Sequence, residues 1–194
     1  MDPALLRCEL VPVVGPYVDE AGRPPRALIL DLGGEGVIGV LDPATNAVIT
    51  SAGLAQITAI PAKYGHIVPD NSEGPPKKEY TQPQLLLHVP GMPNLRIGPL
   101  PMRDSVWSGK QFRYAWRRGA SRSSSEGPTH VVTEAEWLNL LERLGLGDSV
   151  VDEYTSGKLD HRERFAKVRG LALLALYLGV FAALVVWLVI YATR

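Results

Sequence analysis

The stretch TEAEWLNLLERLGL, residues 133–146, predicts a capped amphipathic helix near the end of the soluble part of this 194-residue chain. Thr133 is the expected N-cap, and Glu136 three residues later completes a capping box. Gly145 is expected to end the helix. The helical spacing of apolar residues predicts one buried face, formed by Trp137, Leu140, Leu141 and Leu144.

Upstream of this helix, short β-like runs alternate with turn signals. The clearest run is Gln111–Arg117, in which apolar and basic residues alternate: Phe112, Tyr114 and Trp116 share one face, Arg113 and Arg117 the other. Six further runs are expected to be strands: Ala27–Leu32, Val37–Leu41, Ala47–Ser51, Leu54–Ile60, Gln84–Val89 and Asn94–Gly98. Residues 69–83 and 119–128 are rich in proline, glycine or serine and predict two loops.

Seven short strands followed by one capped helix, with Trp137 on its buried face, resemble the pleckstrin-homology superfold. The resemblance covers roughly residues 27–146. It implies a mainly β fold, a half-open barrel of about seven antiparallel strands with the helix closing one end. A different small β-barrel or sandwich is the alternative, and Leu5–Val14 would be an extra strand or a strap. Phosphoinositide-binding members carry Lys and Arg around the first hairpin, whereas Gly33–Gly36 here holds Glu35, which favours a protein-binding scaffold.

Downstream of the helix, residues 171–192 (LALLALYLGVFAALVVWLVIYA) carry no charge. About 20 apolar residues match the roughly 30 Å hydrocarbon core of a bilayer. The N-terminal region has acidic residues and prolines where a signal peptide needs basic and apolar segments. By the positive-inside rule, we expect a tail-anchored single pass in the inner (plasma) membrane with a cytoplasmic N-terminal domain. The cations before the span are Arg162, Arg164, Lys167 and Arg169, against Arg194 after it.

These patterns divide the chain into four predicted parts. They are an N-terminal strap (1–25), a cytoplasmic β-rich domain (26–147), a juxtamembrane helical linker (148–169) and a transmembrane helix (170–192). The second helix is expected to begin near Asp160 and to run unbroken into the membrane, because no proline interrupts it.

Charge is distributed unevenly between these parts. Residues 161–194 carry five basic residues and one acidic residue, and the whole chain is neutral, so residues 1–160 carry a net charge of −4. An acidic domain argues against nucleic-acid binding. The basic cluster 162–169 suits anionic lipid head groups, at roughly 1 kcal/mol per cation. Cys8 is the single cysteine, which excludes a disulfide within the chain and a thiolate metal site.

The sequence offers little evidence for a catalytic or cofactor-binding motif. Gly34–Gly39 satisfies G-x-G-x-x-G, but Asp42 and Pro43 leave no room for the helix of a dinucleotide site, so a hairpin turn is expected. The four histidines are too scattered along the sequence to match the spacing of metal ligands: His66, His88, His130 and His161. The sequence has no nucleophile elbow or P-loop. We expect no catalytic, cofactor-binding or metal-binding residues and no enzymatic activity.

Two sets of residues are candidates for contacts with partners. Small residues form one stripe of the apolar helix and predict helix–helix packing: Ala172, Ala175, Gly179, Ala182 and Ala183. In the basic-aromatic stretch 103–122, cations on the exposed face are candidates to meet a partner: Arg113, Arg117 and Arg118. The alternative is structural, with the aromatic residues packed inward and the arginines only solvated.

The expected function is that of a non-catalytic subunit that packs its tail helix against a polytopic membrane protein or transporter complex and docks or regulates through its β-rich domain. A peripheral sensor of anionic lipid and an enzyme at the membrane are the alternatives. Arg outnumbers Lys fourteen to six, which is typical of a high-GC bacterium such as an actinobacterium. In architecture the chain is similar to small mycobacterial single-pass accessory subunits of mammalian-cell-entry lipid importers. That resemblance implies permease helices and an ATPase as partners, and lipid import as the process.

Overall fold

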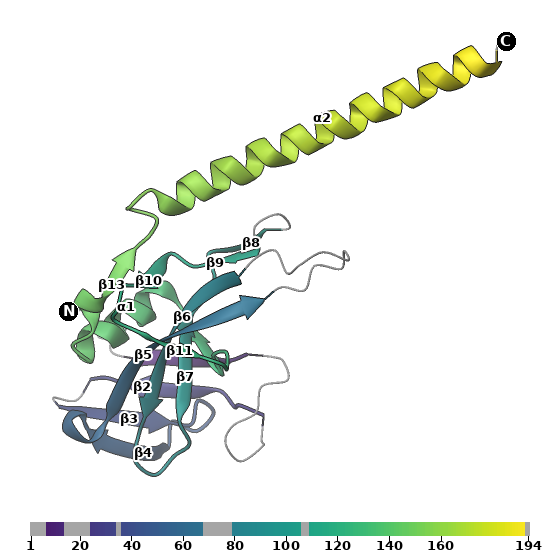
Figure 1. Cartoon of the computed structure of the whole chain (residues 1–194). Helices are drawn as coiled ribbons and strands as arrows, with labels where there is room; N and C mark the ends of the chain where they lie inside the picture. The colour runs from purple at the N-terminus through teal and green to yellow at the C-terminus, as the bar shows by residue number, and fades with distance from the viewer. Residues whose placement is uncertain (1–6, 14–23, 34–35, 68–78, 106–108, 193–194) are drawn as a thin grey trace.

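The computed structural model describes residues 7–13, 24–33, 36–67, 79–105 and 109–192 (Figure 1). A β-rich domain comes first, and one long helix projects from it. The main sheet contains β1 (Arg7–Pro12), β2 (Leu28–Asp31), β3 (Val37–Leu41), β4 (Val48–Gly53), β5 (Thr58–Ile67), β6 (Glu79–His88), β7 (Leu95–Pro99), β11 (Arg122–Ser124) and β12 (His130–Val132). The other elements are η2 (Leu54–Gln56), β8 (Arg103–Ser105), β9 (Gly109–Gln111), β10 (Tyr114–Trp116), α1 (Glu134–Arg143), η3 (Gly147–Ser149), β13 (Val150–Asp152) and α2 (Lys158–Ala192).

The main sheet is mixed and open, with the strand order β11-β5-β6-β7-β12-β1-β2-β3-β4. Strand β1 joins its two halves, because Arg7–Leu10 pair with β2 while Val11 and Pro12 pair with β12. Two pairings are parallel, β5 with β11 and β7 with β12. Two small ribbons, β8–β9 and β10–β13, form separate two-stranded sheets.

The mainly β class with a C-terminal helix is confirmed, but the pleckstrin-homology-like barrel is not. The sheet does not close, since β4 and β11 are its two end strands. The predicted antiparallel meander fails where β11 and β12 insert beside β5 and β7 in parallel. Strand β11 lies inside 119–128, which the sequence predicts as a loop.

Helix α1 matches its prediction closely and covers the core. The Thr133 hydroxyl accepts a hydrogen bond from the Glu136 N–H at 3.4 Å, and the Glu136 carboxylate accepts from the Thr133 N–H at 2.8 Å. Gly145 adopts φ +69°, the left-handed conformation that favours glycine at a helix end. Helix α1 packs on β1 and β7, and Trp137 is completely buried there. The Trp137 ring meets Trp116 edge to face at 5.9 Å.

Most of the strand predictions are close. Strand β3 has the predicted bounds, and β2, β4 and β7 differ from theirs by one or two residues. The antiparallel pairing of β2 with β3 confirms the predicted hairpin, and strand β3 follows Gly36; Gly34 and Glu35 lie outside the described residues. Gln111–Arg117 is not one strand, because it divides between β9 and β10, yet Phe112 and Tyr114 are buried as their alternation predicts.

Other predictions need correction. Leu54–Ile60 begins with the 3-10 turn η2 and becomes strand only at Thr58. The predicted loop 69–83 is wrong from Glu79 onward, where β6 begins; residues 68–78 lie outside the described part. Leu5–Val14, predicted as an extra strand or a strap, contains β1, an inner strand of the sheet with Cys8 and Leu10 buried, so the alternative of an extra strand is confirmed.

The second helix, α2, begins at Lys158, two residues before its predicted start. The predicted linker 148–169 is helical only from Lys158 onward, because Val150–Asp152 form β13 and pair with β10. From Leu171 to Ala192 every side chain is exposed, and the mean hydropathy reaches 2.8. This helix is therefore long and apolar enough to cross a membrane.

Candidate functional site

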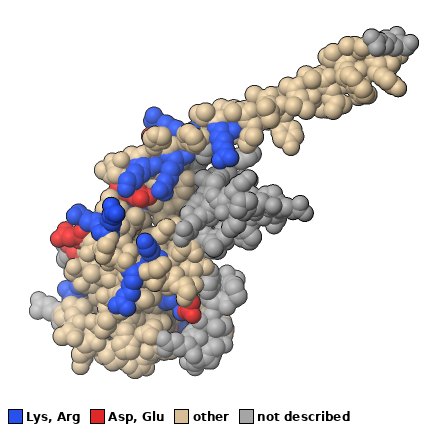
Figure 2. Space-filling model, in the orientation of Figure 1, with Lys and Arg blue, Asp and Glu red and all other residues tan. Residues whose placement is uncertain are grey.

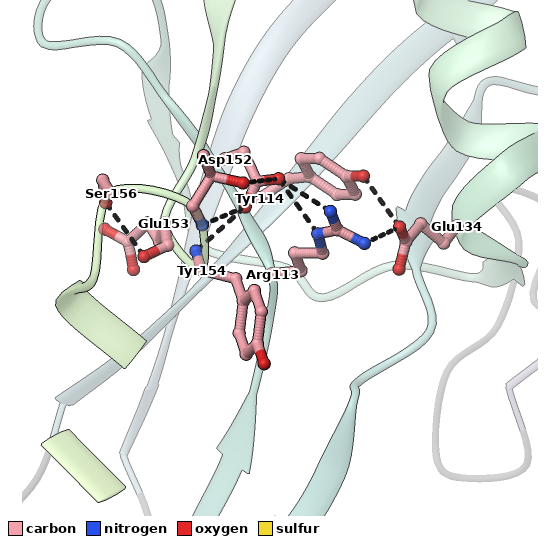
Figure 3. A network of polar contacts seen from close by, with 8 residues as sticks. Arg113, Tyr114, Glu134, Asp152, Glu153, Tyr154 and Ser156 are labelled. Atoms are coloured by element: carbon pink, nitrogen blue, oxygen red, sulfur yellow. Dashed lines mark hydrogen bonds and ion pairs between the residues drawn. The ribbon is translucent and has the colours of Figure 1, made fainter. Parts of the chain in front are cut away.

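The polar network at the base of α2 is centred on Arg113, which lies just before β10 (Figure 3). Its Nε and Nη2 atoms donate to the same oxygen of Asp152, at 3.0 and 2.9 Å. Its Nη1 atom donates to Glu134 in the first turn of α1. One partly buried guanidinium thus connects β10, β13 and α1.

Two tyrosines complete the surroundings of this guanidinium. The rings of Tyr114 and Tyr154 lie with their centroids 5.5 and 5.8 Å from it, within cation–π range. The Tyr114 hydroxyl donates to Glu134 at 2.9 Å. Burial, followed by the hydrogen bond to Glu134, raises the pKa of Tyr114 to about 12. The hydrogen bond to Asp152 raises the pKa of Arg113, which therefore stays charged.

Asp152 also shapes the turn that leads into α2. One carboxylate oxygen accepts hydrogen bonds from the N–H groups of Tyr154 and Thr155, at 2.9 and 3.0 Å. The other accepts from the Thr155 hydroxyl at 2.9 Å. Burial opposes ionisation, but the hydrogen bonds from Arg113 and Thr155 outweigh it and lower the pKa of Asp152 to about 2.

Glu153 attaches the first turn of α2 to the domain. Its carbonyl accepts from the N–H groups of Lys158 and Leu159, at 3.0 and 3.3 Å. Its carboxylate lies 3.9 Å from the Lys158 ammonium and 3.5 Å from the Arg162 guanidinium. The Leu159 side chain is buried, although the rest of the described helix is largely exposed. The network and this turn together form what we call the joint, residues 113, 114, 134 and 152–159.

The joint changes the interpretation of Arg113, which the sequence predicted to face a partner. Its guanidinium is bound by Asp152 and Glu134 within the chain, so its partners are internal. Arg117 and Arg118 are exposed, beyond the end of β10. The structure does not bring these three arginines into one site.

The predicted lipid-facing cations all lie on the first part of α2. Arg164 pairs with Asp160 at 3.0 Å, and Arg162 pairs with Glu153. Lys167 and Arg169 are exposed and have no ion pair within the described part of the chain.

The small-residue stripe on α2 contacts no other element. Ala172, Ala175, Ala182 and Ala183 are exposed, and a Cβ added at Gly179 would meet nothing within 4 Å. Nothing in the described structure therefore tests the predicted helix–helix contact.

Two further titratable groups are structural. His130 is buried, and its Nε2 atom donates to the Arg26 carbonyl at 2.9 Å, since a carbonyl can only accept. Burial lowers its pKa and keeps the ring neutral. Burial also raises the pKa of the Cys8 thiol to about 12. Within the described ranges, no group of three or more His, Cys, Asp or Glu residues could hold a metal ion.

The sequence interpretation missed Asp152, Glu134 and Glu153. A signal existed for the first, because an Asp followed by a Thr three residues later is typical of a turn built on the Asp side chain. The pairing of Arg113 with Asp152 depends on β10 meeting β13, and these strands of three residues carry little pattern of their own.

Comparison with protein-family models, curated proteins and solved structures finds no match to this chain.

Proposed function

We propose that this chain is a non-catalytic, membrane-anchored subunit. Helix α2 crosses the inner (plasma) membrane once, and the β-rich domain remains on the cytoplasmic side. The observation that carries the proposal is the uncharged segment 171–192, whose side chains are all exposed on one continuous helix. Apolar surface of this extent is stable in lipid or against other apolar helices, not in water.

The cations at the base of α2 support the proposed orientation. Lys167 and Arg169 stand one turn or less before the apolar segment and have no ion pair in the described structure. Cations at this position favour the cytoplasmic side and attract anionic lipid head groups. The same observation favours the second candidate function, a sensor of anionic lipid.

The proposed partner is a polytopic membrane protein or a transporter complex. The stripe through Ala175, Gly179 and Ala183 allows another helix backbone to approach closely. Tethering then raises the effective concentration of the β-rich domain near its partner to the millimolar range, so weak contacts suffice. Lipid import is the process implied by the resemblance to accessory subunits of mammalian-cell-entry importers.

Affinity purification of the tagged full chain from native membranes in mild detergent tests this proposal. We expect stoichiometric recovery of a polytopic partner with the unaltered chain. Gly179→Leu with Ala183→Leu should abolish that recovery without preventing insertion. The control, Val180→Phe with Val185→Phe, adds bulk on other faces of the helix and should retain the partner.

Two results would overturn the proposal. Recovery of the unaltered chain alone would remove the subunit function and leave the lipid sensor. Equal recovery of the partner with both double variants would show that the small-residue stripe is not the contact.

A further inference from the structure

We propose that residues 117–122 (RRGASR) dock an acidic, extended segment of a protein partner. This inference rests on the proposed function and supplies the chemistry of the contact in the aqueous phase. We call Arg117, Arg118 and Arg122 the arginine corner. All three are exposed, and no ion pair or side-chain hydrogen bond occupies them within the described residues. By contrast, Arg96 and Arg113 are paired with carboxylates.

The backbone holds the corner in a fixed shape. The Ala120 N–H donates to the Arg117 carbonyl at 3.0 Å, and Gly119 adopts φ +84°, which defines a type II turn with Arg118 at its first central position. The Arg117 N–H donates to the Ser149 carbonyl at 2.8 Å. After the turn, β11 pairs with β5. A preformed site loses less conformational entropy when it binds a ligand.

A shallow, open hollow with a mixed polar and apolar lining lies beside these cations. Residues 59–61 of β5 and residues 119–122 line an open depression of about 450 Å³. Its lining includes the apolar side chains of Ala59, Ile60, Pro61 and Ala120. The Trp116 indole N–H donates to the Ala62 carbonyl at 2.6 Å and ties β5 to the Trp137 core. The hollow therefore has a firm wall and room for an apolar side chain.

A strand edge is available at the same place. Strand β11 ends the main sheet, and no described strand pairs with its outer edge. An extended peptide can bind such an edge through its main chain, while its side chains enter neighbouring pockets. Carboxylates on this peptide would meet three guanidinium groups that have no ion pair among the described residues, and an apolar side chain would enter the hollow.

Position favours a protein partner over lipid. Tyr114 pairs with Asp152 at the end of the β10–β13 ribbon next to α2, whereas Trp116 pairs with Val150 at the other end, where the corner begins. Residues 158–170 add about 20 Å of helix before the apolar segment. The Debye length at physiological salt is about 8 Å, so the field of lipid head groups is largely screened over this distance.

Charge complementarity supports an acidic segment. Residues 1–160 carry a net charge of −4, so the corner is a local positive site on an acidic domain. Figure 2 shows basic side chains on this face of the β-rich domain as well as at the base of α2. Such a local positive site attracts an acidic segment, while the negative charge elsewhere disfavours binding in other positions.

Binding of a defined peptide to the full chain in phosphatidylcholine nanodiscs tests the inference. The probe is fluorescein-labelled Glu-Glu-Leu-Glu-Glu-Leu-Glu-Glu, measured by fluorescence anisotropy, and its Gln-for-Glu version is the matched control. Arg117→Glu with Arg118→Glu should weaken binding of the Glu peptide by about tenfold or more. As the matched control, Arg118→Glu alone should weaken binding severalfold, whereas Arg26→Glu, the same change of charge at an exposed site away from the corner, should change the affinity less than about twofold.

The outcomes separate this inference from the proposed function. Equal affinity of the double variant and Arg26→Glu for the Glu peptide, or equal affinity of the chain for the Glu and Gln peptides, would overturn the acidic docking site. Corner-dependent binding of phosphatidylserine vesicles without peptide binding would replace it with a lipid site. If the polytopic partner fails to co-purify but peptide binding still depends on the corner, the docking site stands and the subunit proposal fails.

Discussion

Arg113 and Asp152, far apart in sequence, are joined by two hydrogen bonds that converge on one carboxylate oxygen. The pair closes the β10–β13 ribbon next to the turn from which α2 begins. Because the same guanidinium also binds Glu134, the direction of α2 is connected to helix α1 and to the core around Trp137.

Replacing Arg113 with Lys should destabilise the β-rich domain by about 1–2 kcal/mol. An ammonium cannot reach Asp152 and Glu134 together with the geometry of a guanidinium, so one carboxylate loses its partner. Urea unfolding of the full chain in detergent, followed by tryptophan fluorescence, measures the loss. Arg118→Lys, at an exposed position with no ion pair among the described residues, is the matched control and should leave the midpoint unchanged. Equal midpoints for the two variants would contradict the role of the joint.

The domain should lose stability as the pH falls from about 4 to about 2. The pKa of Asp152 is about 2 in the folded chain and 3.8 in its ordinary state, so the unfolded chain takes up the proton first. The contribution of ionised Asp152 to the free energy of unfolding is therefore complete above pH 4. It disappears as the pH falls through the pKa that Asp152 has in the folded chain. Thermal unfolding across this range should show a steeper decline for the unaltered chain than for Asp152→Asn. If the unfolding temperatures of the two proteins fall equally with pH, Asp152 is not a source of the pH dependence.

Cys8 should resist iodoacetamide in the native chain and react after unfolding. The thiol is completely buried, and its pKa is raised to about 12, so almost no reactive thiolate exists near neutral pH. Mass spectrometry of the alkylated protein in increasing urea should place labelling at the fluorescence transition. Rapid labelling without denaturant would mean that β1 leaves the sheet easily, contrary to its inner position.

Gly145→Ala should destabilise the domain by about 1 kcal/mol, whereas Gly147→Ala should have little effect. Gly145 has φ +69°, and an added Cβ would meet nothing within 4 Å, so the cost comes from backbone strain alone. Gly147 has no positive φ, and its added Cβ would lie 3.9 Å from the Glu142 Cα atom, an ordinary contact. Differential scanning calorimetry of the two variants compares them directly. A similar shift for both would contradict the left-handed end of α1.

Local signals account for the parts of the fold that could be predicted. The capping box of α1 depends on Thr133 and Glu136, which are three residues apart, and Val37–Leu41 is an apolar run between turns. The apolar segment of α2 follows from composition alone. In each case the residues that determine the structure are neighbours in the chain.

The remainder depends on contacts between distant segments. Strands β11 and β12 have three residues each and pair in parallel with β5 and β7, far away in the sequence. Alternation predicted opposite faces for Arg113 and Tyr114, but both side chains reach Glu134, a contact between distant segments that alternation could not show. Arg113 was therefore predicted to meet a partner, whereas its guanidinium binds Asp152 and Glu134 within the joint.

The uninterrupted course of α2 has a mechanical consequence. Its first turn is fixed to the domain through Glu153 and Leu159, and no proline occurs between Lys158 and Ala192. Such a helix resists twisting, so a turn of its apolar end about the helix axis is transmitted as torque to the domain. A neighbour in the membrane that rotates or tilts the apolar end would change the orientation of the domain and the direction in which the arginine corner faces. The orientation of the β-rich domain in the aqueous phase would thus depend on how α2 packs inside the membrane.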